Sequence, residues 1–205
     1  MYVPAHFAAP ADALDQLLAA PGAVDLVSST AGGLTATTLP MLHDPVAGTF
    51  SGHLARTNPQ WRDTAGDVLV IVRGPDAYVS PGWYASKAEH GRVVPTWDYV
   101  LAHVHGELVV HDDAGWLAQH VRRLTDAHEA GRAQPWAVAD APEGFVAGQL
   151  RAIVGVEVRI RRVEAKWKLS QNRPAADIDG VVAGLTADGR PEVAAAVQKA
   201  RPPGR

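Results

Sequence analysis

The sequence contains no cysteine among its 205 residues. This absence excludes disulfide bonds, thiolate nucleophiles and cysteine-ligated zinc, but it leaves the redox compartment open because cytosolic and exported proteins can both lack cysteine. Long apolar runs are missing too, since no window approaches the roughly 20 apolar residues that a membrane-spanning helix needs. We therefore expect a soluble, cytoplasmic protein with no membrane partner.

An excess of charge of one sign is also absent. The chain carries 19 Lys and Arg against 22 Asp and Glu, for a formal net charge of -3. The surface as a whole therefore has no strong positive electrostatic potential that would bind a polyanion through counterion release. The helical stretches show no helix-turn-helix with a basic second helix. DNA stays open as a partner through a local basic patch, but no DNA-reading motif is visible.

Common catalytic motifs are missing as well. The sequence has no phosphate-binding G-x-x-x-x-G-K-[ST], no G-x-G-x-x-G after a strand and no G-x-S-x-G. His103 and His105 fall on the same face of an expected strand, where two imidazoles could share a metal ion. Because no third ligand is evident nearby, we predict no metal site, and the residues that would carry catalysis stay unknown.

The patterns that are present predict a β-rich protein. Hydrophobic residues make up 47% of the chain, which is enough for one well-filled core. Period-2 or doubly apolar segments predict strands at 23–30, 34–42, 48–55, 67–74, 77–84, 93–111 and 156–169. Helical spacing predicts helices after Pro10, from Asn58, over 113–131, within 142–155 and in the Ala-rich tail. We expect one domain over 1–205, a barrel-like α+β core with peripheral helices and a helical tail at about 174–200.

The segment "GHLARTNP" has the ingredients of a phosphate site. His53 ends an expected strand, Arg56 follows it, and Asn58 with Pro59 marks a helix start whose first backbone N–H groups would favour an anion. The simpler interpretation makes Arg56 an ordinary surface cation and Asn58 only a helix cap. The residues alone leave both interpretations open.

Two further segments combine aromatic and polar side chains. Trp97 and Tyr99 face one way on their expected strand, as pocket residues or as a core aromatic pair. The stretch "EAKWKLSQNRP" at 164–174 carries three cations, one indole and two amides. It could be a solvated edge, a nucleic-acid contact or an anion-binding arm.

Five segments together resemble the PaiB family of FMN-binding proteins, which are often described as negative transcriptional regulators. They are "MYVPAHF", "LPMLHD…GHLARTNPQW", "YVSPGWY", "VPTWDYVLAHVHG" and "KWKLSQNRP…D…GVVAGL". The similarity spans nearly the whole chain in the same order. It implies a split β-barrel that forms a homodimer, with FMN in a groove to which both subunits contribute.

The resemblance also implies which residues bind the cofactor, in four short segments. One segment lies along the flavin, a second reaches the phosphate end, a third belongs to the same pocket, and the last forms an arm at the site that either subunit could supply. In that order the residues are Thr37, Thr38 and Leu39; His53, Arg56 and Asn58; Trp97 and Tyr99; and Trp167, Lys168, Ser170, Gln171 and Asn172. Asp98 departs from the pattern, because the family more often has Asn there, and this puts a direct flavin contact at that position in doubt.

Three functions follow as hypotheses. The first is an FMN-binding dimer of the PaiB type with a role in negative regulation of transcription. The second is a flavin-dependent oxidoreductase, in which the isoalloxazine carries the electrons and no acid–base dyad need appear in the sequence. The third, drawn from related split barrels, is haem binding or breakdown, with His103 or His105 as candidates. Whether the protein is an enzyme is left open.

Overall fold

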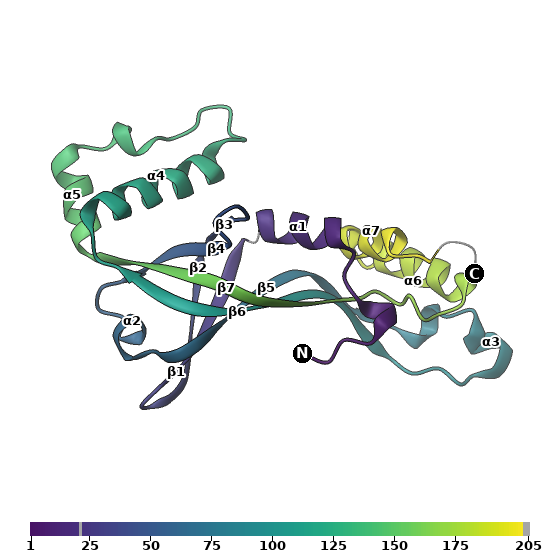
Figure 1. The fold of residues 1–205 in the computed structure, drawn as a ribbon. Helices are drawn as coiled ribbons and strands as arrows, with labels where there is room; N and C mark the ends of the chain where they lie inside the picture. The colour runs from purple at the N-terminus through teal and green to yellow at the C-terminus, as the bar shows by residue number, and fades with distance from the viewer. Residues whose placement is uncertain (21, 203–205) are drawn as a thin grey trace. The chain divides into compact units, whose positions relative to one another are not determined.

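The computed structural model describes residues 1–20 and 22–202 and contains a seven-stranded sheet (Figure 1). The strand order is β2-β1-β5-β6-β7-β4-β3, and the pairs β1–β2, β1–β5, β3–β4 and β4–β7 are antiparallel. The strands are β1 (Ala23–Thr30), β2 (Gly33–Pro40), β3 (Leu42–Asp44), β4 (Thr49–Ala55), β5 (Ala65–Val79), β6 (Thr96–His111) and β7 (Ile153–Lys168).

Helices occupy the connections and the C-terminal tail. The α-helices are α1 (Ala11–Ala19), α2 (Gln60–Asp63), α3 (Ser86–His90), α4 (Ala114–Glu129), α5 (Glu143–Arg151), α6 (Ala175–Ala187) and α7 (Pro191–Lys199). Three short 3-10 helices are η1 (Ala5–Phe7), η2 (Pro81–Trp83) and η3 (Val138–Asp140). None of the helices in the described part of the chain is long and apolar enough to cross a membrane. The predicted β-rich α+β class with peripheral helices is confirmed.

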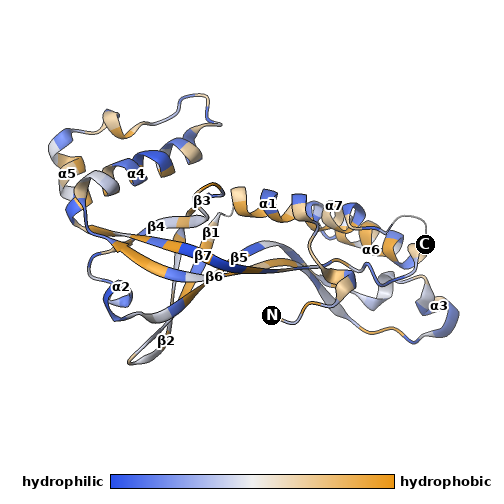
Figure 2. Ribbon diagram, viewed as in Figure 1, coloured by the Kyte–Doolittle hydropathy of each residue, from blue (hydrophilic) through white to orange (hydrophobic). Residues whose placement is uncertain are grey.

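The long strands β5 and β7 have the residue patterns from which strands were predicted. Orange and blue segments alternate along β7 in Figure 2, as the period-2 pattern predicts. On β5, Val68, Val70 and Val72 are buried, whereas Leu69 and Ile71 between them stay partly exposed. The second face of β5 is therefore apolar but less well covered than the first. The predicted strands at 67–74 and 77–84 form the single strand β5, which ends at Val79.

The chain divides into two compact units, each built from several segments. The first unit comprises 1–14, 73–102 and 164–205, and the second comprises 15–72 and 103–163. In the first unit, α6 packs closely on η2: a Cβ on Gly180 would lie 1.9 Å from the Trp83 carbonyl oxygen. In the same unit Asp177 accepts hydrogen bonds from the Ser86 backbone N–H and hydroxyl.

The second unit has its core on the sheet. Leu26, Phe50, Val70 and Val156 are fully buried there. Helix α4 begins after Asp113, whose side chain accepts a hydrogen bond from the Trp116 N–H at 2.8 Å and so caps the helix.

Candidate functional site

The second unit brings Thr37 and Asn58 together. The Asn58 side-chain amide donates to the Thr37 hydroxyl at 2.9 Å, and its oxygen accepts from the Gln60 backbone N–H at 2.9 Å. Asn58 thus caps the first turn, as predicted, although the helix itself begins one residue later than expected, at Gln60. The Gln60 side chain is buried and donates to the Leu26 carbonyl and the Ser28 hydroxyl. Sequence reasoning missed Gln60, because glutamine next to a helix start is usually exposed.

The other two residues predicted along the flavin on β2 point to opposite faces. Thr38 is exposed and donates to Asp25, its cross-strand partner on β1, at 2.6 Å. Leu39 is buried. Because successive side chains alternate across a strand, Thr37 and Leu39 share the inward face and Thr38 lies on the outer one.

Arg56 is already held by the protein. Its Nε donates to the Arg151 carbonyl at 2.8 Å, and its terminal nitrogens form a two-point ion pair with Asp112 and a bond of 2.9 Å to the Ile153 carbonyl. The ion pair raises the pKa of Arg56 and lowers the pKa of Asp112, chiefly through their hydrogen bonds. A phosphate at Arg56 would therefore share the guanidinium with Asp112, which sequence reasoning did not identify.

His53 belongs to a group of stacked rings. Its Nδ1 lies 3.3 Å from Nε2 of His120 on α4, so one ring donates and the other accepts. The Trp116 ring stacks on His111 and on His120, with centroid distances of 4.2 and 5.1 Å. Burial lowers the pKa of His53, and burial with the nearby His53 lowers the pKa of His120 to about 4. Both rings are therefore neutral at physiological pH.

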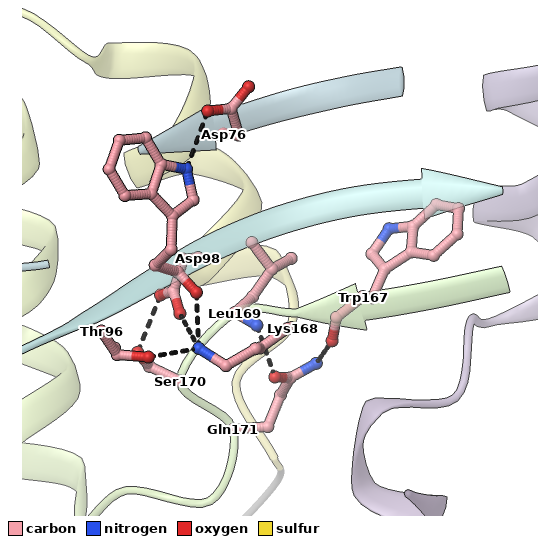
Figure 3. A network of polar contacts seen from close by, with 9 residues as sticks. Asp76, Thr96, Asp98, Trp167, Lys168, Leu169, Ser170 and Gln171 are labelled. Carbon is pink, nitrogen blue, oxygen red and sulfur yellow. Dashed lines mark hydrogen bonds and ion pairs between the residues drawn. The ribbon is translucent and has the colours of Figure 1, made fainter. Parts of the chain in front are cut away.

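The first unit contains the polar network around Lys168 (Figure 3). The Lys168 ammonium donates to the Thr96 hydroxyl at 2.6 Å and to the Trp97 carbonyl, and it lies 3.6 Å from a carboxylate oxygen of Asp98. Two hydrogen bonds and one ion pair therefore hold the ammonium in place. Lys168 thus ties the end of β7 to the start of β6 within this unit.

Asp98 is fully buried and holds the turn after β7. Its Oδ2 accepts from the Ser170 hydroxyl at 2.7 Å. Ser170 has φ 62°, the one positive φ found at a non-glycine residue in the described part of the chain. Burial raises the pKa of Asp98, although Ser170 and Lys168 act in the opposite direction. Because the Asp98 side chain faces the interior, its role is to position the turn rather than to touch a ligand.

The remaining residues of this motif also stabilise the turn. Gln171 accepts from the Leu169 N–H at 2.8 Å and donates to the Trp167 carbonyl. Trp167 is buried, and Asn172 is exposed. The motif that looked like a binding arm therefore has two kinds of residue, those that shape the turn and those that remain accessible on it.

Trp97 and Tyr99 lie on the accessible face of β6, opposite the buried Asp98. Trp97 is 50% exposed, which excludes the alternative of a core aromatic pair. Its indole N–H donates to Asp76 at 2.8 Å and fixes the ring. Trp97 and Tyr99 line a hollow of about 290 Å³ together with Arg73 and Leu101. Flat apolar surfaces beside a cation and a carboxylate suit a planar heteroaromatic ring, so this part of the unit fits an isoalloxazine.

The histidines considered for metal or haem lie close to each other on β6. The ring centroids of His103 and His105 are 6.4 Å apart, with an interplanar angle of 69°. Each ring is partly buried in the sheet.

Comparison with known protein families shows what kind of protein has this arrangement. A family model described as "Putative FMN-binding domain" matches residues 1–162. This match covers well over half of the chain, and the chain belongs to this family.

Curated relatives agree with that assignment. Protease synthase and sporulation protein PAI 2 of Bacillus subtilis is 32% identical over 146 residues, which cover 69% of this chain and 67% of that protein. An uncharacterised protein of Aspergillus fumigatus is 32% identical over 176 residues, with coverage of 69% and 67%. The predicted resemblance to the PaiB family is confirmed.

Solved structures of low sequence identity share the fold, which is of the split-barrel type. A conserved hypothetical protein of Mycobacterium tuberculosis matches with a TM-score of 0.58 at 11% identity, covering 85% of this chain and 94% of that one. The flavocytochrome Anf3 from Azotobacter vinelandii has a TM-score of 0.56 at 13% identity, with coverage of 77% and 67%. The FAD and haem binding protein of Mycobacterium smegmatis has a TM-score of 0.54 at 18% identity, with coverage of 85% and 78%.

Proposed function

We propose that this protein is an FMN-binding homodimer whose bound flavin serves a regulatory role of the PaiB type. One observation supports the proposal most strongly: the half-exposed Trp97 and the neighbouring Tyr99 line the same hollow. The chain that contains this hollow belongs to an FMN-binding family. When bound, the isoalloxazine supplies the electron-transfer chemistry. The protein's part is to bind and orient the ring and to hold the phosphate.

The proposed cofactor contacts fall into two groups that are tested separately. In the first unit, Trp97 and Tyr99 would cover the ring, and the accessible residues of the turn at 167–172 would contact it. In the second unit, Thr37, Thr38 and Leu39 would lie along the flavin. His53, Arg56 and Asn58 would reach toward the phosphate end. The hydrogen bonds described above fix all four segments, so the contact residues are ordered in advance of binding.

The homodimer is supported by the second face of β5. Leu69 and Ile71 stay partly exposed on this central strand, between β1 and β6 in the sheet. An apolar face on a central strand is normally covered, and a second copy of the chain would cover it. Light scattering across micromolar concentrations should return twice the chain mass, and replacing Ile71 with Asp should give monomers. A wild-type protein that stays monomeric would remove the dimer and any shared site.

The direct test of the cofactor is the visible spectrum of the purified protein, before and after FMN is added. Twin flavin bands that stay with the protein through gel filtration would support the proposal. A protein that separates completely from FMN and from riboflavin would refute it.

The oxidoreductase hypothesis is the second candidate, and the exposure of the Trp97 face is what favours it, because a substrate needs access to the ring. The test is whether bound flavin is reduced by a nicotinamide nucleotide and reoxidised by an acceptor. A gel-shift assay with promoter DNA is run on the same preparation. Turnover without DNA binding would favour the enzyme, and DNA binding that depends on flavin redox state would favour the regulator.

Haem binding is the third candidate. Two proteins of similar fold are a flavocytochrome and an FAD and haem binding protein, and His103 and His105 place imidazoles on β6. A Soret band after addition of haem, lost on replacement of either histidine, would support it. Flavin bands alone would leave the FMN proposal standing.

A further inference from the structure

A polar hollow in the second unit lies between helix α4 and the strands β3, β4 and β7. Its volume is about 230 Å³. The residues that line it are mostly polar, and they are Asp44, Ala47, Thr49, Ser51, Trp116, Gln119, His120, Arg123 and Glu157. It is separate from the hollow beside Trp97, which belongs to the other unit.

Two largely buried residues present hydroxyl groups to this hollow without a protein partner. Thr49 is 9% exposed and Ser51 is 7% exposed, and neither side chain hydrogen-bonds to any residue between 1–20 and 22–202. Neither hydroxyl oxygen is among the fully buried unpaired atoms of the described residues, so both are accessible from the hollow, where water or a ligand can hydrogen-bond to them. Ser28 shows the usual outcome: it is 2% exposed, and its hydroxyl accepts hydrogen bonds from Gln60 and Thr64.

Glu157 adds an acceptor beside these hydroxyls. It is the cross-strand partner of Ser51 in the β4–β7 register. Its carboxylate lies 3.8 Å from the nearest nitrogens of His111 and Arg159, which is too far for a hydrogen bond. The His111 Nε2 is itself buried without a hydrogen bond. The carboxylate therefore retains acceptor capacity toward the hollow.

The remaining charges offset one another. Arg123 lies 3.6 Å from Asp44 at the hollow. His120 is neutral because burial lowers its pKa to about 4. The Trp116 ring, which also lines the hollow, stacks on the imidazoles of His111 and His120. The lining therefore carries two carboxylates, one guanidinium and one amide, together with hydroxyls that both donate and accept.

We propose that this hollow is a binding site for a small neutral polyol, such as a sugar alcohol or a monosaccharide. Each hydroxyl of a polyol both donates and accepts, which matches a wall that combines carboxylates, a guanidinium, an amide and two free hydroxyls. Ordered water is the competing occupant, because water can also satisfy these groups. The site adjoins the proposed FMN contact His53, whose Nδ1 lies 3.3 Å from Nε2 of His120 in the lining, and no reaction is assigned to it.

The test is a titration of the full-length protein with xylitol, followed by amide chemical shifts in nuclear magnetic resonance spectra. Saturable shifts should concentrate at Thr49, Ser51, Gln119 and Glu157. Replacing Ser51 with Ala should weaken binding about tenfold, as expected for loss of one or two hydrogen bonds, with little change in stability because the hydroxyl has no protein partner.

Ser28→Ala is the matched control, since it removes a buried hydroxyl that does have partners. It should lower stability and leave xylitol binding unchanged. Glu157→Gln keeps the size of the side chain and should weaken binding as Ser51→Ala does.

Three outcomes would overturn the proposal. Shifts that do not saturate would mean that the hollow holds water only. Equal xylitol affinity in wild type and Ser51→Ala would place binding elsewhere. Displacement of xylitol by FMN but not by inorganic phosphate would assign the hollow to the ribityl chain of the flavin, because that chain is itself a polyol.

Discussion

Two regions of this protein bury a serine next to a carboxylate, and they treat the pair differently. In the first unit Ser170 donates to Asp98 at 2.7 Å, and Lys168 completes the group. In the second unit Ser51 lies opposite Glu157 in the β4–β7 register, yet its hydroxyl has no partner among the described residues. In the first arrangement the serine hydroxyl donates to Asp98 Oδ2 and holds a backbone turn, while Asp98 Oδ1 has an ion pair but no hydrogen bond; in the second the Ser51 hydroxyl stays available to another molecule. Burial of polar residues therefore does not mark a binding site unless their hydrogen bonds are also counted.

The largest effect should come from breaking the network around Asp98. Asp98→Ala leaves the Ser170 hydroxyl and the Lys168 ammonium without their carboxylate, and it should lower the free energy of unfolding by about 3 kcal/mol. Asp98→Asn, which restores the residue more common in the family, keeps an acceptor for Ser170 and should cost less. Urea denaturation measures both. Equal losses for the two variants would show that the hydrogen bond to Ser170 contributes nothing.

The histidine pair of the second unit should make stability depend on pH. His120 has a folded pKa of about 4, below its ordinary value of 6.5, so the unfolded chain binds more protons between these values. Stability should be highest above pH 6.5, fall as the pH drops toward 4, and level off below that, with a total loss of about 3 kcal/mol.

Denaturation at several pH values measures this loss. His120→Gln should remove most of the slope, and His128→Gln, at an exposed position of the same helix, should retain it. A slope that survives in His120→Gln would assign it to other groups.

Arg56 separates a structural ion pair from a phosphate contact. Arg56→Ala should weaken FMN by roughly 10- to 150-fold, the range for loss of a charge-assisted hydrogen bond, and should weaken riboflavin far less. Asp112→Ala breaks the same ion pair but keeps the cation, so FMN affinity should hold or rise. Fluorescence titration of both flavins into the three proteins gives the comparison. Equal losses of FMN affinity in the two variants would leave Arg56 with a structural role only.

The smallest structural change should follow from Trp97→Phe, because the side chain is half exposed. Folding should stay intact, while quenching of the bound flavin's fluorescence by the indole should decrease. A sharp drop in melting temperature with unchanged flavin emission would instead place Trp97 in the core.

Local patterns in the sequence predicted most of the fold. The period-2 alternation located β7, a β-rich run located β1, and Asn58 marked the helix start that it caps. The short helix α3 was not predicted, because five residues carry too little periodicity to be recognised. On α4 the expected apolar stripe included Val121, but the buried face instead contains His120, which an apolar pattern does not reveal.

The contacts in the candidate site were harder to predict, because the residues that form them are far apart in the sequence. The resemblance named Arg56 and Lys168, yet nothing local pointed to Asp112, 56 residues from Arg56, or to Thr96, 72 residues from Lys168. Such pairs form only when strands far apart in the chain meet in one sheet. Sequence patterns therefore identified the side chains that are available for chemistry, but not the contacts that already occupy them.

The most direct test of FMN binding by a dimer is a titration of FMN into the purified wild-type protein, followed by flavin fluorescence and gel filtration. We expect saturable binding with one flavin per chain, quenched emission, and a flavin that elutes with the dimer. Emission that rises in proportion to added FMN without saturation, with all of the flavin separating from the protein, would contradict it.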